Sequence, residues 1–89
     1  MSIFTNLSAN IELYKKLMDQ NVTIIATYHT FGNNADEFIN KAICLKQYMI
    51  SDLLKINVMF EKKFINNSLY VYDKLKPHIE QIELCLEHH

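Results

Sequence analysis

The sequence has few of the residues that break helices and few of those that build catalytic sites. In 89 residues it has one glycine, one proline, two cysteines and no tryptophan, and its nine cations are all lysine. A single glycine excludes a glycine-rich phosphate loop and a dinucleotide-binding fingerprint. Two cysteines are too few for a disulfide framework. The lack of arginine argues against reading of DNA bases, since bidentate contacts to guanine favour the guanidinium group.

Charge and apolar runs exclude further classes of protein. The formal net charge is −1, so the chain has no strong electrostatic attraction for nucleic acid or an acidic membrane. No run of about eighteen apolar residues occurs, so no membrane span is expected. The first five residues lack the basic start and apolar core of a signal peptide. We therefore expect a cytoplasmic protein with no nucleic-acid partner.

The last four residues, 86–89, read Leu-Glu-His-His and resemble a vector-derived linker that runs into a polyhistidine tag. Residues 1–85 are then expected to form a single helical domain. With 49% apolar residues the chain is typical of a folded protein with a small core.

What the sequence does contain is long stretches of helical periodicity. From Ala35 to Phe64 there is no glycine or proline, and the apolar residues fall within roughly half of a helical wheel advanced by about 100° per residue. This pattern predicts one long helix. Its apolar stripe is nearly twice as wide as the roughly 100° of an ordinary surface helix, which indicates two packing neighbours.

A second long helix is predicted from Phe4 to Thr30, where apolar residues repeat at steps of three and four. Within it, the β-branched segment 22–28 could instead alternate as a strand. We favour the helix because the repeat continues in phase and no turn signal interrupts it. A lone strand would also have no partner in this chain.

Two breaks separate three predicted helices. Residues 31–34 contain the only glycine, and Asn34 with Glu37 can form a capping box for the next helix. After residues 65–68, Asn67 or Ser68 would cap a third helix that runs to about residue 85. Pro77 either bends this helix on its polar side or opens a new helix after a break at Lys76.

The expected fold is therefore all-α: an antiparallel hairpin of two long helices with a shorter third helix, a coiled-coil-like three-helix bundle. The third helix, about 27 Å long, would cover only part of a hairpin of about 40 to 45 Å. If about 500 Å² of apolar surface stayed exposed, about 12 kcal/mol would be lost, so we expect a homodimer. A monomeric bundle of shorter helices is the competing interpretation. The interface residues we expect are Leu17, Ile24, Ile39, Ile43, Ile50 and Leu54.

No catalytic, cofactor-binding or metal-binding residues are expected. His29 falls on the apolar side of the first predicted helix, where a histidine is usually a packing residue. His78 does not share a helix face with Glu80 or Glu83, which weakens a metal site. No cofactor is implied, and we do not expect an enzyme.

The function expected is a protein–protein interaction or assembly module that buries apolar helix faces in a homodimer or against a partner helix. One alternative is an amphipathic protein that coats a lipid or granule surface. Another is a small regulatory or nucleic-acid-acting protein. The asparagine, lysine and isoleucine bias suits a bacterial or phage accessory protein, but the sequence does not indicate the biological process.

Overall fold

The structure is a computed structural model, and it describes residues 1–30, 34–49, 52–60 and 62–86. It overturns the all-α prediction, because strands and helices alternate along the chain. The elements in order are β1 (Ser2–Thr5), α1 (Ile11–Asp19), β2 (Thr23–Tyr28), α2 (Ala35–Tyr48), β3 (Leu54–Phe60), the 3₁₀ turn η1 (Lys62–Phe64), α3 (Ile65–Leu75) and β4 (Ile82–Leu86).

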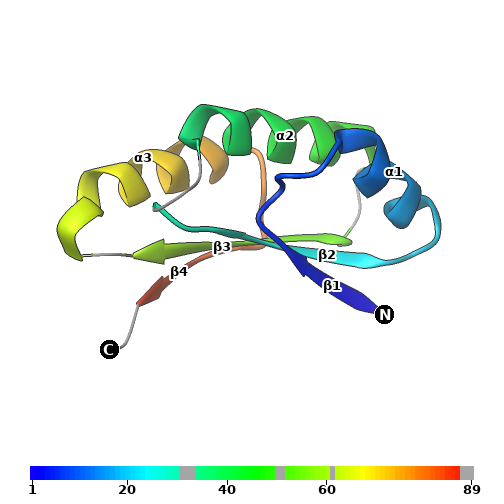
Figure 1. Cartoon of the computed structure of the whole chain (residues 1–89), viewed down its shortest axis with the longest axis horizontal. Coiled ribbons are helices and arrows are strands. Elements are labelled where there is room, and N and C mark those ends of the chain that lie inside the picture. Colours follow the sequence, from blue (N-terminus) through cyan, green and yellow to red (C-terminus); the bar gives the residue numbers. More distant parts are fainter. Residues whose placement is uncertain (31–33, 50–51, 61, 87–89) are drawn as a thin grey trace.

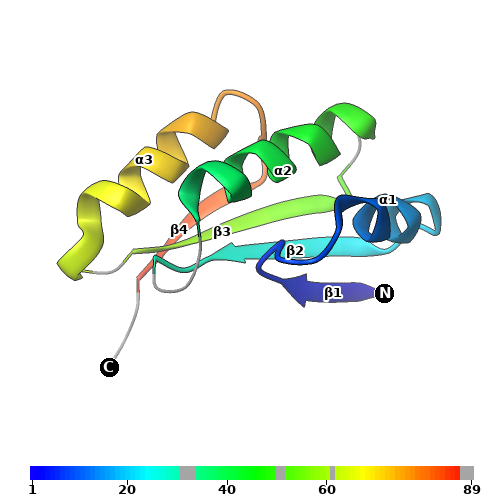
Figure 2. The ribbon, with the colours of Figure 1, turned by 45° about the horizontal axis from the view of Figure 1, so that its top comes forward.

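The four strands form one parallel sheet in the order β1-β2-β3-β4. Each pair of neighbouring strands is joined by a crossover that contains a helix. Because the strand order never reverses, crossovers of one hand place every helix on the same side. Figure 1 shows the three helices above the sheet, and Figure 2 shows them side by side across it. The protein is therefore a two-layer α/β structure, and the helical-bundle and coiled-coil interpretations are wrong.

The first predicted helix, residues 4–30, is in fact a βαβ unit. Its middle part is helical, and Tyr14 and Met18 of α1 are buried as the periodicity indicates. The helix ends at Asp19, and Asn21, two residues further on, has a positive φ of 62°. Asparagine tolerates this left-handed conformation better than most residues, so the chain turns there without a glycine. The β-branched segment that follows is the strand β2, so the helix that we favoured there is wrong and the strand alternative is confirmed.

The long predicted helix, residues 35–64, contains α2 and β3. Its start is confirmed: Asn34 Oδ1 accepts a hydrogen bond from the backbone N–H of Glu37, at 3.0 Å. The helix ends at Tyr48, however, and Leu54 begins a strand. In β3 the buried residues Leu54, Ile56 and Val58 alternate with more exposed ones, which is the period of a half-covered strand.

The third predicted helix is also divided, into α3 and β4. Asn67 and Ser68 lie inside α3 and do not cap it, since the helix begins at Ile65. The alternative break at Lys76 is confirmed, because α3 ends at Leu75, but Pro77 lies in a turn and does not open a new helix. β4 continues to Leu86, one residue into the segment interpreted as a tag. The predicted turn at Gly32 lies outside the described residues.

The core lies between the helix layer and one face of the sheet. Strand side chains from β2 and β3 meet helix side chains there, and most are less than 3% exposed. Its members include Ile24, Ala26, Tyr28, Leu54, Ile56, Val58, Tyr14, Met18, Phe38, Ala42, Leu45, Val71 and Leu75. Within the described ranges, no helix is both long enough and apolar enough to cross a bilayer.

Two tyrosine–aspartate hydrogen bonds join neighbouring helices. Tyr48 of α2 donates to Asp19 of α1, at 2.8 Å, and Tyr70 of α3 donates to Asp36 of α2, at 2.8 Å. In each case the hydrogen bond to the carboxylate favours the neutral phenol and raises the pKa of the tyrosine above 10.0. These bonds link α1 to α2 and α2 to α3 at the surface of the helix layer.

Candidate interaction face

The sheet has one covered face and one uncovered face. In β2, Ile24, Ala26 and Tyr28 point into the core, so the residues between them point to the opposite side. No helix of the described chain lies on that opposite side (Figure 1). We call it the open face. The strand register places on it Phe4 from β1, Thr23, Ile25 and Thr27 from β2, Lys55, Asn57 and Met59 from β3, and Glu83 and Cys85 from β4.

The open face is hollowed and carries both apolar and charged groups. Phe4 is 76% exposed, which is unusual for a phenylalanine in a strand. A shallow hollow of about 470 Å³ runs from Phe4 and Ile25 across to Lys55 and Glu83. The lining of the hollow thus includes the apolar side chains of Phe4 and Ile25, the positive charge of Lys55 and the negative charges of Glu80 and Glu83.

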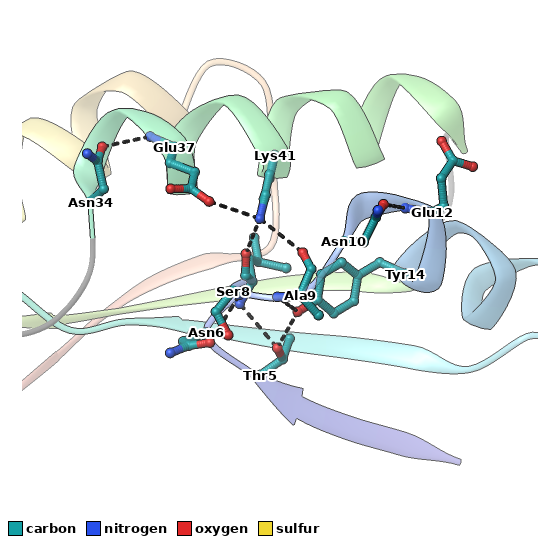
Figure 3. Close-up of polar contacts among 11 residues, drawn as sticks. Thr5, Asn6, Ser8, Ala9, Asn10, Glu12, Tyr14, Asn34, Glu37 and Lys41 are labelled. Carbon is teal, nitrogen blue, oxygen red and sulfur yellow. Dashed lines mark hydrogen bonds and ion pairs between the residues drawn. The ribbon is translucent and has the colours of Figure 1, made fainter.

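A second polar region lies at the carboxyl end of β1, where the loop 6–10 leads into α1 (Figure 3). The Lys41 ammonium from α2 donates to the carbonyl oxygens of Leu7, at 2.9 Å, and Ala9, at 3.0 Å. It also lies 3.1 Å from a Glu37 carboxylate oxygen. The lysine thus fastens the loop to the helix layer.

Tyr14 holds the same loop from the other side. Its hydroxyl accepts a hydrogen bond from the backbone N–H of Ala9, at 3.0 Å, and lies 2.9 Å from Thr5 Oγ1 (Figure 3). Leu7 is buried in the loop at a φ of 60°. Lysine and tyrosine are residues that catalytic sites use, but here their polar atoms are occupied by loop contacts. We therefore assign this region a structural role.

The described residues hold no group of three or more histidine, cysteine or carboxylate side chains that could bind a metal ion. Cys44 and Cys85 are both half-buried free thiols. The topology also lacks a feature on which many α/β proteins rely. Ligands of open parallel sheets usually bind where the strand order reverses, and the order β1-β2-β3-β4 has no reversal.

Comparison with known proteins gives no family. No protein-family model, curated protein or solved structure matches the chain. Its function is therefore argued from its own surface.

The six residues predicted for the interface are placed differently by the structure. Ile24, Ile39 and Leu54 are enclosed in the core of the protomer, and Leu17 and Ile43 pack against that core. Ile50 lies outside the described residues. Their assignment to an interface stays a prediction. Ile24, Ile39 and Leu54, however, are already buried by other residues of the same protomer.

The residues of the open face were missed because they lay in segments interpreted as helix. One signal could have found them: in 54–60, Lys55 and Asn57 interrupt an otherwise apolar run at every second position. In a helix Lys55 falls on the polar side and Asn57 interrupts the apolar stripe, whereas in a strand the two residues share one face.

Proposed function

We propose that this protein is a protein-interaction module that binds a partner protein on the open face of its sheet. The observation that carries the proposal is the parallel sheet, which in the described part of the chain has helices on one face only. All-parallel sheets are found almost entirely in proteins whose sheets are covered on both faces. The uncovered side of this sheet is therefore the surface that most needs a partner.

The chemistry of the open face supports a protein as the partner. Phe4 and Ile25 supply apolar contact area, and an aromatic side chain near the centre of an interface is a frequent source of binding energy. Lys55 and Glu83 of opposite sign would orient the partner through complementary charges. A partner surface that brings an apolar ridge flanked by an acidic and a basic group fits this arrangement.

The surface-coating alternative loses its basis. It required long helices with a free apolar side, whereas α1, α2 and α3 are 9, 14 and 11 residues long and turn their apolar sides to the sheet. The described lysines include Lys41 and Lys55, which lie on different sides of the molecule, so no observation favours a nucleic-acid-acting protein.

Site-specific photo-crosslinking tests the proposal. A photoreactive phenylalanine analogue in place of Phe4, in cells of the source organism, should give a covalent adduct with a partner protein. The matched control carries the same analogue in place of Tyr48, which is 45% exposed on the helix layer. No adduct at position 4, or equal adducts at both positions, would refute the proposal.

A binding measurement on the partner so identified gives the magnitude. Burying a phenylalanine side chain contributes about 1.5–3 kcal/mol, so Phe4→Ser should weaken binding by roughly 10- to 100-fold. Because Phe4 is 76% exposed in the protomer, the same substitution should leave the unfolding temperature almost unchanged.

A further inference from the structure

A different surface, at the edge of the sheet, carries an inference that does not depend on the open face. Among the residues that the structure describes, β4 is paired on one side only, with β3. The carbonyl oxygen of Gln81 accepts from the Ile56 N–H, at 2.9 Å. Backbone groups of successive strand residues alternate between the two sides, so the N–H and C=O groups of Ile82 and Leu84 point to the outer edge.

The outer edge of β4 has little to prevent pairing with another chain. Natural edge strands are usually protected by lysine, proline or a bulge. β4 reads Ile-Glu-Leu-Cys-Leu, with no lysine or proline. Its one charged side chain, Glu83, lies on the open face.

An apolar strip runs beside this edge on the helix side of the sheet. Leu84 is 40% exposed, although its register partner Val58 on β3 is fully buried. On α3, Asn67 bonds Tyr28 of β2 and Tyr70 bonds Asp36 of α2, which identifies the flank of α3 that faces those elements. At about 100° per residue, Ile65 and Leu69 lie on the opposite flank, toward β4.

Ile65 and Leu69 are 40% and 38% exposed, and with Leu84 they form what we call the edge strip. The strip is level with the C-terminal half of β4. Ser68 Oγ donates to the carbonyl oxygen of Met59, at 2.9 Å, and Met59 is the register partner of Cys85. The turn of α3 that carries Leu69 is therefore level with Leu84 and Cys85 along the strand direction, so an unpaired strand edge and an apolar strip occur at the same level of the sheet.

We propose that a second copy of this chain docks here, with the two β4 strands antiparallel about a two-fold axis at Leu84. The two four-stranded sheets then become one continuous sheet. The axis stands normal to the sheet, so both helix layers lie on the same side. The edge strip of one copy meets the edge strip of the other, which is the self-complementary contact that a two-fold interface requires.

The backbone and the charges both select Leu84 as the centre. In this register Leu84 lies opposite Leu84 of the second copy, and the outward N–H and C=O groups of the two residues bond to each other. The outward N–H and C=O groups of Ile82 bond in the same way to Leu86 of the second copy. This register makes about six main-chain hydrogen bonds. It places Glu83 opposite Cys85 of the second copy. A register centred on Glu83 would oppose two carboxylates and align backbone groups already bonded to β3.

The occupant is a second copy because the surface is complementary to itself. An unrelated strand could bond to the free backbone groups of β4, but it would also need apolar side chains to bury Leu69 and Ile65. A second copy brings such side chains at the same distance above the sheet. The contact is limited to one strand and one helix flank. Interfaces this small are of the weak class, so we expect a dissociation constant of about 1–100 µM.

Sedimentation equilibrium over roughly 1 to 500 µM protein tests the proposal. The mass should rise from 10.5 kDa toward about twice that value. Leu84→Lys should weaken dimerisation at least tenfold. The matched control is Leu13→Lys on α1, where the leucine is 49% exposed on the helix nearest the other edge of the sheet. A mass of 10.5 kDa throughout, or equal effects of the two variants, would overturn the proposal.

Disulfide trapping tests the register itself. In the proposed pair, Glu83 and Cys85 of the second copy are directly opposite with Cα atoms about 4.5 Å apart, within the range of a disulfide. Glu83→Cys, with Cys44→Ser to remove the other thiol, should give a covalent dimer on mild oxidation. Adding Leu84→Pro, which removes an outward N–H, should abolish it. A covalent dimer that survives Leu84→Pro would contradict the register, as would a series of larger species, which head-to-tail pairing of β4 with β1 would produce.

Discussion

Replacing Lys41 by methionine tests whether α2 holds the loop between β1 and α1. The ammonium donates to the carbonyl oxygens of Leu7 and Ala9, and the lysine side chain is only 19% exposed. Methionine keeps most of the apolar stem that packs along α2 but has no donor. The substitution therefore removes the two carbonyl contacts and the ion pair to Glu37 while changing little of the packing.

The magnitude follows from the partners. A hydrogen bond to a charged group contributes about 1.5–3 kcal/mol, and two are lost. Water can reach part of the loop in the variant, so the released carbonyls are partly solvated again, and we expect a loss of about 2 kcal/mol. The ion pair adds little, because Glu37 is 59% exposed and surface pairs contribute about 0.2–1 kcal/mol.

Urea unfolding followed by circular dichroism measures this loss, and thermal unfolding should show a fall of about 8–16 °C. Glu37→Gln is the matched control, since it removes the ion pair but leaves both carbonyl contacts, and it should lose less than about 0.5 kcal/mol. If Lys41→Met lost no more than Glu37→Gln, the carbonyl contacts would not hold the loop and the reasoning would be refuted.

Three further predictions concern the helices. The raised pKa values of Tyr48 and Tyr70 favour the neutral phenols in the folded state, so their contribution to stability is present below pH 10.0 and is lost as the pH rises through the folded-state values. Urea unfolding of the double Tyr→Phe variant should show a smaller loss between about pH 9 and 11; an unchanged slope would contradict this. Asn21→Gly should raise the free energy of unfolding by about 0.5 kcal/mol, because φ is 62° there, and a loss of stability would be the opposing result. Leu75→Ala, at a fully buried position, should lower it by about 2–5 kcal/mol in the same assay, and a change below about 1 kcal/mol would show that the site is not packed as described.

The sequence allowed some local features to be predicted because they depend on neighbouring residues alone. The cap at Asn34 is an example, since the side chain that accepts and the N–H that donates are three residues apart. The buried spacing of Tyr14 and Met18 in α1 is another, because a four-residue step lies on one helix face in any fold. Neither feature depends on what the helix packs against.

The strands could not be predicted in this way, because each depends on a partner far away in the sequence. The segment 23–28 alternates, and it was interpreted as helix because no other strand was recognised. Its partner β3 lay in another segment interpreted as helix, so each strand was rejected for want of the other. The turn after α1 also carried no glycine as a signal, because Asn21 takes the left-handed conformation that glycine often takes at a helix end. The missing turn signal and the missing partner reinforced each other.

The apolar excess that led to the dimer prediction was real, but the helical interpretation put it in the wrong place. In the structure, the apolar side chains of Leu54, Ile56 and Val58 are buried against the helix layer of their own protomer. What stays uncovered is fixed by the sheet: side chains such as Phe4, which point away from the helices, and backbone groups at the outer edge of β4.

These two uncovered surfaces point in perpendicular directions, and this makes the two proposals separable. A partner on the open face approaches along the normal of the sheet, whereas a second copy at β4 extends the sheet within its own plane. Glu83 and Cys85 belong to both, because their side chains lie on the open face and their backbones lie in the edge strand. Leu84 belongs to the edge alone and Phe4 to the open face alone. Substitutions at those two positions therefore report on one surface each, and dimerisation would double the open face without covering it.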